Sequence, residues 1–241
     1  MIIQERLLKI CGVVMGISGF VIIFSTLYPI LSYEWESAQK YPTLISPLVD
    51  EEKAAFKFSK TDYTKASNWF SGDGSDTDFS NNEVLFFTIS IPKLGIDNAS
   101  VAIGGENLSD NLIQYPGTAL PGKIGNAVIF GHSILPQYFD PSNYLSIFST
   151  LPELAEGDSV YANFDGIMYK YNVEDMFEVT PKDIQILEQD ISNSYLTLVT
   201  CTPPGHPLKP KRLIVRAKLI PSNKGLTIQA NETISHSTRL K

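Results

Sequence analysis

The chain has 241 residues and a formal net charge of −7, so it has room for one sizeable domain and some additional segments. The acidic charge, and the lack of a basic stripe with interleaved aromatic residues, argue against a nucleic-acid-binding protein. Hydrophobic residues make up 43% of the sequence, enough for a real buried core.

The first element along the chain is an apolar segment. Residues 10–31 carry no charge, and as a helix they would cover roughly 33 Å, against about 30 Å for the core of a bilayer. Arg6 and Lys9 precede the segment and Glu34 follows it, which predicts a single-pass anchor in the cytoplasmic membrane, with the N-terminus inside and the rest outside. A cleaved signal peptide is the alternative, but its apolar core is shorter and residues 33–36 offer no small-x-small cleavage site.

The sequence divides into five predicted segments. These are a short cytoplasmic segment (1–9), a transmembrane anchor (10–32), a partly disordered extracytoplasmic spacer (33–83), a β-rich domain (84–220) and a polar flexible tail (221–241). Trp69 and Phe70, within the spacer, are candidates to pack onto the domain. The acidic stretch 71–78 invites a calcium-loop interpretation. Counted from Asp76, however, the loop lacks its glycine and its bidentate glutamate, so we predict no cofactor and find no support for calcium dependence.

From residue 84 onward, apolar runs alternate with turn signals. The predicted strands are 85–91, 99–103, 127–130, 158–164, 167–173, 196–199 and 213–219. Asp165-Gly166 predicts a two-residue hairpin, and short helical pieces are expected at 144–148 and 183–187. Seven or eight short strands favour a closed β-barrel or a sandwich over any βαβ design.

A single cysteine, Cys201, ends one of these apolar runs. Cys11 lies inside the predicted span, so Cys201 has no exported partner for a disulfide, which is unusual for an exported domain. Only a thiolate attacks well, and a neighbouring imidazole or guanidinium lowers the pKa of a thiol. His132, which follows the 127–130 run, and Arg212, which opens the last strand, supply these groups.

Two arginines compete for the place beside the thiol. Thr197, Val199 and Cys201 share one strand face, and the loop 202–211 can return the chain so that Arg212 stands opposite Cys201. Arg216 lies on the same face but about 13 Å further along the strand. We therefore favour Arg212.

Three other interpretations of these residues stay open. A buried cysteine in a strand is commonly a small core residue, and a histidine after a strand is commonly a hydrogen-bonded loop residue. A zinc site from Cys201, His206 and His132 would lack the fourth ligand and the paired spacing that structural zinc sites show.

Several stretches carry a more specific signal. Residues 197–203 read Thr-Leu-Val-Thr-Cys-Thr-Pro and residues 212–216 read Arg-Leu-Ile-Val-Arg. Residues 115–122 and 125–133, the second of which contains the candidate histidine, fit the same pattern, as does Gly157-Asp158. Together, over about residues 85–219, they resemble the sortases, the cysteine transpeptidases of the bacterial cell surface.

The resemblance implies a fold and an activity. The expected fold is an all-β, closed eight-stranded barrel with short helices, preceded by one N-terminal transmembrane helix. Sortases recognise a Leu-Pro-x-Thr-Gly-like sorting motif near the C-terminus of a surface protein and cleave it between Thr and Gly. They hold a thioacyl intermediate and pass it to an amine, either on a cell-wall peptide or on a pilin lysine. The implied partners are therefore proteins with a C-terminal sorting signal and an amine acceptor, with no nucleic acid.

The resemblance also implies roles for individual residues. Cys201 matches the nucleophile, His132 the general acid/base and Arg212 the residue that orients substrate and stabilises the oxyanion. The matching substrate contacts are Thr200, Ile184, Ile186 and Leu187, the last three in the loop that precedes the cysteine strand.

The subclass stays open. The motifs around Cys201 and Arg212 resemble the pilin-polymerising class C, but neither its Asp-Pro-aromatic lid motif nor its second membrane span is visible, so class D or E remains an alternative. A thiol hydrolase or peptidase of the same fold would use the same three residues. A non-catalytic surface β-domain, such as an adhesin, would normally carry a C-terminal sorting signal, and residues 221–241 show none.

Overall fold

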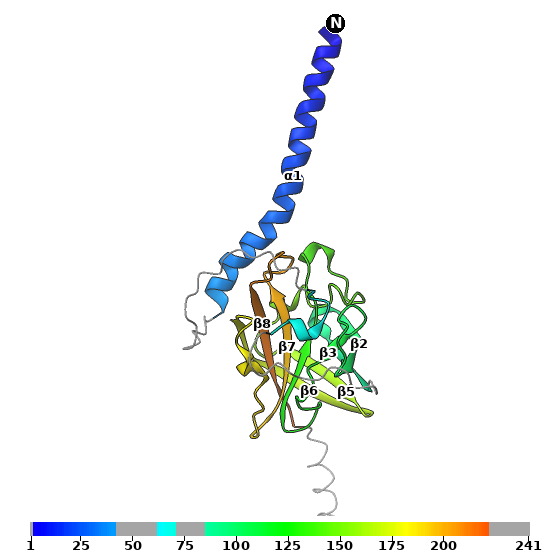
Figure 1. Ribbon diagram of the computed structural model, residues 1–241, viewed down its shortest axis with the longest axis vertical. Coiled ribbons are helices and arrows are strands. Elements are labelled where there is room, and N and C mark those ends of the chain that lie inside the picture. Colours follow the sequence, from blue (N-terminus) through cyan, green and yellow to red (C-terminus); the bar gives the residue numbers. More distant parts are fainter. Residues whose placement is uncertain (1, 42–61, 71–84, 222–241) are drawn as a thin grey trace, which may run out of the picture.

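The computed structural model describes residues 2–41, 62–70 and 85–221 (Figure 1). Within these residues, the one α-helix and the eight strands are α1 (Ile2–Lys40), β1 (Leu85–Ile91), β2 (Ile96–Ile103), β3 (Leu112–Gln114), β4 (Gly125–Phe130), β5 (Ser159–Phe164), β6 (Ile167–Val179), β7 (Ser194–Thr202) and β8 (Lys211–Leu219). Short 3₁₀ helices are η1 (Ala66–Asn68), η2 (Pro92–Leu94), η3 (Pro136–Tyr138), η4 (Leu151–Glu153) and η5 (Ile184–Leu187).

The eight strands close into a barrel in the order β1-β2-β3-β4-β7-β8-β6-β5. This confirms the predicted fold class, a closed eight-stranded barrel. The β2–β3 and β4–β7 pairs are parallel, and the remaining neighbours are antiparallel. Closure pairs every strand on both sides, so the sheet exposes no free edge.

The β5–β6 hairpin has the turn that the sequence predicts. Asp165 and Gly166 both adopt positive φ angles, 53° and 73°, as a two-residue turn of this kind requires. β6 then continues to Val179, beyond the predicted end. The register shifts between Val173 and Asp175, and this irregularity breaks the alternating pattern from which the strand was predicted.

The two helical predictions have different outcomes. Residues 184–187 form η5 within the predicted range. Residues 144–148 form successive turns, so the predicted helix there is wrong. The Ser146 hydroxyl bonds the backbone N–H and C=O of Asp140, and such local side-chain bonds compete with a helix. Strand β3 was not predicted, because three residues are too few to show a period.

The alternation of β7 separates two hydrophobic clusters. Leu196 and Leu198 join the larger cluster, which receives side chains from all eight strands and fills the barrel. Val199 and Cys201 join a second cluster on the opposite face of β7. Cys201 therefore faces away from the barrel interior, over the outer face of the sheet.

Helix α1 has 39 residues and extends well beyond the predicted anchor. It is long and apolar enough to cross a membrane, and the apolar part of it is not buried against the barrel. The first residues of the predicted spacer, 33–40, continue this helix. The remaining spacer residues, apart from 41 and 62–70, and the tail from 222 lie outside the described residues.

Candidate active site

Three neighbouring strands bring the predicted catalytic residues into one row. In the parallel β4–β7 pair Phe130 stands opposite Val199. Two residues further along each of these segments, His132 is level with Cys201. In the antiparallel β7–β8 pair Cys201 stands directly opposite Arg212. Adjacent strands lie about 4.8 Å apart. The three residues that the sequence singled out therefore lie together.

Arg216 lies elsewhere on the sheet. It pairs with Thr197, four residues before Cys201, and its guanidinium lies over the rings of Phe177 and Tyr195, at 5.7 and 5.8 Å. The cross-strand register is therefore the one expected from the sequence, with Arg212 at the thiol.

Two hydrogen bonds hold the histidine segment against the cysteine strand. The Ser133 hydroxyl donates to the Cys201 carbonyl at 2.6 Å, and the Thr200 hydroxyl donates to the Gly131 carbonyl at 2.8 Å. Both bonds flank His132. Thr200 is fully buried on the face of β7 opposite Cys201, so the structure gives it a contact beside His132; its role in substrate binding stays a prediction.

The guanidinium of Arg212 is buried and engaged by backbone. Nη1 donates to the carbonyls of Lys209 (2.8 Å) and Lys211 (3.1 Å), and Nη2 donates to the carbonyl of Trp69 (3.1 Å). The rings of Tyr63 and Trp69 lie 5.6 and 5.4 Å from the guanidinium carbon. These contacts fix the orientation of the charged group beside Cys201.

Residues 62–70, which we call the covering segment, lie over this cluster. Trp69 is fully buried; its ring stacks on Phe130, with 5.3 Å between centroids, and lies 5.6 Å from the ring of His132. Its indole N–H donates to the Tyr63 carbonyl, which folds the segment on itself. The predicted packing of Trp69 and Phe70 onto the domain is confirmed, although no Asp-Pro-aromatic motif is present to signal it.

The η5 segment borders the same cluster. Ile186 is buried with Cys201 in the outer cluster, and Ile184 and Leu187 pack against its edge. The side-chain amide of Asn126 donates to the Ile186 carbonyl at 2.9 Å, which ties η5 to β4. The structure thus places these three apolar residues in or against the cluster that contains the thiol, and their contact with a substrate stays a prediction.

Burial controls the protonation of both candidate reactive groups. Burial raises the pKa of the Cys201 thiol, although the positive charges of Arg212 and Lys209 act against this. Burial, with a smaller contribution from Lys209, lowers the pKa of His132 to about 4, although Asp62 acts in the opposite direction. The covered site therefore holds an uncharged thiol and an uncharged imidazole.

A carboxylate that was not predicted from the sequence, that of Glu178, supports the ends of β7 and β8. Glu178 Oε1 accepts hydrogen bonds from the Tyr33 hydroxyl (2.8 Å) and the Thr202 hydroxyl (3.0 Å), and Oε2 pairs with Lys211 Nζ at 3.0 Å. Thr202 and Lys211 form the pair that follows Cys201 and Arg212. The only signal in the sequence is a charged residue in an apolar strand end, which is too common to be informative.

No group of three or more His, Cys, Asp or Glu side chains that could hold a metal occurs among the described residues. The acidic stretch 71–78 lies outside them. Cys201 is a free thiol, and His206 uses Nδ1 to accept a hydrogen bond from the Leu208 N–H at 3.1 Å.

Comparison with known proteins identifies a family. A family model described as "Sortase domain" matches residues 89–220. A curated relative, Sortase A of Streptococcus agalactiae serotype III (strain NEM316), is 26% identical over 125 residues, which cover 52% of this chain and 45% of that protein. The chain thus spans about half the length of this relative.

Two solved structures are also similar to this chain. Sortase A from Corynebacterium diphtheriae, a lid mutant, is 29% identical with a TM-score of 0.50, covering 60% of this chain and 75% of that one. A Sortase D5 transpeptidase of Clostridium perfringens is also 29% identical, with a TM-score of 0.48, covering 56% of this chain and 79% of that one.

Proposed function

Because the chain belongs to the sortase family, we propose that it is a membrane-anchored cysteine transpeptidase. Its substrates would carry a Leu-Pro-x-Thr-Gly-like sorting motif, and its acceptor would be an amine on a cell-wall peptide or a pilin lysine. The observation that carries the proposal is the row of His132, just beyond the end of β4, Cys201 on β7 and Arg212 on β8, with an apolar surface around it.

In the first half of the proposed reaction, the Cys201 thiolate attacks the carbonyl carbon of the motif threonine. The backbone carbonyls of Lys209 and Lys211 hold Arg212 in place, so the donor that Trp69 leaves free on opening can stabilise the oxyanion. Protonated His132 gives its proton to the leaving glycine nitrogen as the C–N bond breaks. A thioester between Cys201 and the substrate remains.

In the second half, the acceptor amine attacks the thioester carbonyl. Neutral His132 takes the proton from the amine nitrogen, the C–S bond breaks, and the thiolate and imidazolium are restored. Water in place of the amine gives hydrolysis, which is the expected side reaction.

The covering segment must leave the cluster before a substrate can bind. Trp69 occupies the apolar surface between Phe130 and His132 and takes one donor of Arg212 through its carbonyl. While it is in place, the thiol and imidazole are uncharged, as their shifted pKa values imply. The described arrangement therefore corresponds to a closed, resting enzyme, and opening is part of its activation.

The proposed location is the cytoplasmic membrane. The apolar helix α1 supports a single span, and Arg6 and Lys9 at its start support a cytoplasmic N-terminus and an external barrel. Surface proteins that carry a sorting signal would meet the enzyme on that outer side.

The test uses the full chain with Cys11→Ala, so that Cys201 is the sole thiol. Incubation with Leu-Pro-x-Thr-Gly-like peptides, with and without an amine, should give a mass adduct on Cys201, a released glycine-containing product and an amine-coupled product. Cys201→Ala should give none of these. Peptide turnover that survives Cys201→Ala would refute the proposal, and products without amine coupling would identify a hydrolase.

A further inference from the structure

The contacts between α1 and the barrel extend into the apolar part of the helix. At 1.5 Å per residue the whole helix measures about 58 Å, roughly twice the core of a bilayer. Its last turns pack on the barrel: Tyr33 bonds Glu178, and Lys40 Nζ donates to the Pro152 carbonyl at 2.6 Å. The barrel is therefore fastened directly to the end of the helix.

Two loops of the barrel reach further toward the N-terminus of the helix. We call residues 134–140 and 203–210 the rim. Gln137 of the rim donates a hydrogen bond to the Ser25 carbonyl at 3.2 Å. Ser25 precedes Leu31, the end of the uncharged stretch, by about 9 Å of helix. The rim therefore lies level with the last turns of the part of α1 that would occupy the membrane.

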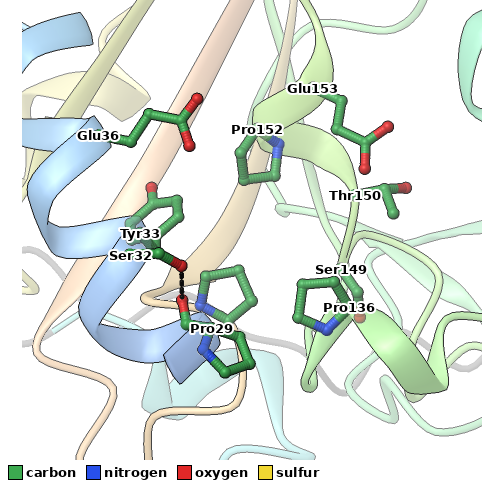
Figure 2. A pocket seen from close by; sticks show the side chains of 10 residues that line it. Pro29, Ser32, Tyr33, Glu36, Pro136, Ser149, Thr150, Pro152 and Glu153 are labelled. Carbon is green, nitrogen blue, oxygen red and sulfur yellow. Dashed lines mark hydrogen bonds between the residues drawn. The ribbon is translucent and has the colours of Figure 1, made fainter. Parts of the chain in front are cut away.

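A cleft of about 190 Å³ lies between α1 and the barrel, and its lining changes from apolar at one end to acidic at the other (Figure 2). Pro29 of the helix and Pro136 of the rim line one end of it, and Glu36 and Glu153 line the other. Since residue 29 precedes residue 36 along α1, the proline end faces the apolar stretch and the carboxylate end faces away from it. This is the gradient expected across a membrane surface.

The rim also exposes side chains that suit the interface of a bilayer. Tyr138 is 62% exposed and Leu208 is 38% exposed. Aromatic residues favour the headgroup level of a bilayer, and exposed apolar side chains can enter the boundary with the acyl chains. Figure 1 shows the rim loops, coloured green and orange, at the end of the barrel that faces α1.

We propose that the rim rests in the headgroup layer of the same bilayer that α1 spans, so that the catalytic cluster opens at the membrane surface. The inference rests on the membrane anchoring in the proposed function. Because one rim loop follows His132 and the other joins Cys201 to Arg212, lipid contact would place the reactive groups where membrane-tethered substrates emerge.

The test measures how close the rim lies to lipid headgroups. The full chain with Cys11→Ala and Cys201→Ala receives a single new thiol, Tyr138→Cys or Leu208→Cys, carrying a fluorescent label. Each variant is placed, one copy per disc, in nanodiscs of phosphatidylcholine and phosphatidylglycerol with a nitroxide on some headgroups. Interfacial side chains lie about 5–10 Å into the boundary, so we expect quenching several-fold stronger than at a control position.

The matched control is Ile167→Cys in the β5–β6 hairpin. Ile167 is 53% exposed, and β6 carries it about 40 Å from Val179, the partner of Arg212. Equal quenching at rim and hairpin in chains that do enter the discs would overturn the rim proposal and leave the anchoring intact. Failure to enter the discs would overturn both. Rim quenching seen only with two copies per disc would assign the rim to a second copy and also overturn the proposal.

Discussion

Arg212 donates a hydrogen bond from Nη2 to the backbone carbonyl of Trp69, at 3.1 Å. The ring of the same tryptophan lies against His132, on the other side of the thiol. One residue of the covering segment thus contacts both neighbours of Cys201 in the row. Covering the site and orienting the arginine are therefore coupled, and release of Trp69 frees one guanidinium donor for a substrate carbonyl.

Removing the Trp69 side chain should uncover the thiol. Replacing a buried aromatic residue by alanine removes about 3–5 kcal/mol of packing free energy. About 1.4 kcal/mol changes an equilibrium constant, here that between the covered and the open site, by a factor of ten. In a Cys11→Ala background, we expect Trp69→Ala to accelerate labelling of Cys201 by a thiosulfonate at least about tenfold. Trp35→Ala is the matched control, because Trp35 is 74% exposed on α1. Equal rates in the two variants would mean that Trp69 does not limit access.

The buried imidazole should make stability depend on pH. The pKa of His132 is about 4 in the folded protein and about 6.5 in the unfolded chain. The unfolded chain therefore binds more protons than the folded chain between these two pH values. The stability that the neutral, buried imidazole allows is complete above about pH 6.5 and is lost as the pH falls toward 4. We expect His132 to account for a loss of about 3 kcal/mol in the free energy of unfolding across this range.

Denaturant titrations in detergent at pH 7 and pH 4.5, followed by near-ultraviolet circular dichroism, measure this loss. His132→Gln should lose less stability on acidification than the parent. An unchanged pH dependence in His132→Gln would show that the imidazole is not buried in its neutral form.

Glu178 should stabilise the ends of β7 and β8. Its carboxylate accepts hydrogen bonds from Tyr33 and Thr202 and pairs with Lys211. A buried polar group that loses its partner lowers the stability by about 1–3 kcal/mol. We expect Glu178→Gln to reduce the free energy of unfolding by about this amount and to lower the acylation rate by loosening the Cys201 strand end.

Glu174→Gln provides the comparison on the same strand. Glu174 pairs with Lys218 at 3.6 Å and is 43% exposed, and surface pairs contribute about 0–1 kcal/mol. If both substitutions have the same small effect, the network around Glu178 does not support the site.

The two arginines of β8 should differ in kinetics. Loss of one oxyanion donor costs about 10²–10³ in rate, so Arg212→Ala should slow single-turnover acylation by about that factor. Arg212→Lys should rescue little, because an ammonium cannot reproduce the fork of donors. Arg216→Ala should lose at most a few-fold. A larger loss at position 216, in protein shown to be folded, would contradict the assignment of Arg212.

Several features of the site are predictable because their signals lie within a few neighbouring residues of the sequence. The apolar run at residues 196–199 predicts β7, and the alternation of side chains along a strand assigns the face of Cys201. The loop that joins the two strands, predicted at 202–211, begins after Cys201 and ends before Arg212, so the two residues are expected to pair across the strands. This expectation needs no knowledge of the barrel. The Asp165-Gly166 turn is equally local.

What the sequence determined by itself is therefore the apolar helix, the barrel strands and the chemical identity of the Cys, His and Arg residues, since each leaves a signal within a few neighbouring positions. Only the tertiary structure decided that Trp69 covers them, that Glu178 joins β7 and β8 to Tyr33, and that thiol and imidazole are uncharged. Tyr33 and Glu178 are 145 positions apart, and Trp69 and Arg212 are 143 apart. Contacts of this kind, and the desolvation that shifts a pKa, arise when distant segments are packed together, and no local period encodes them.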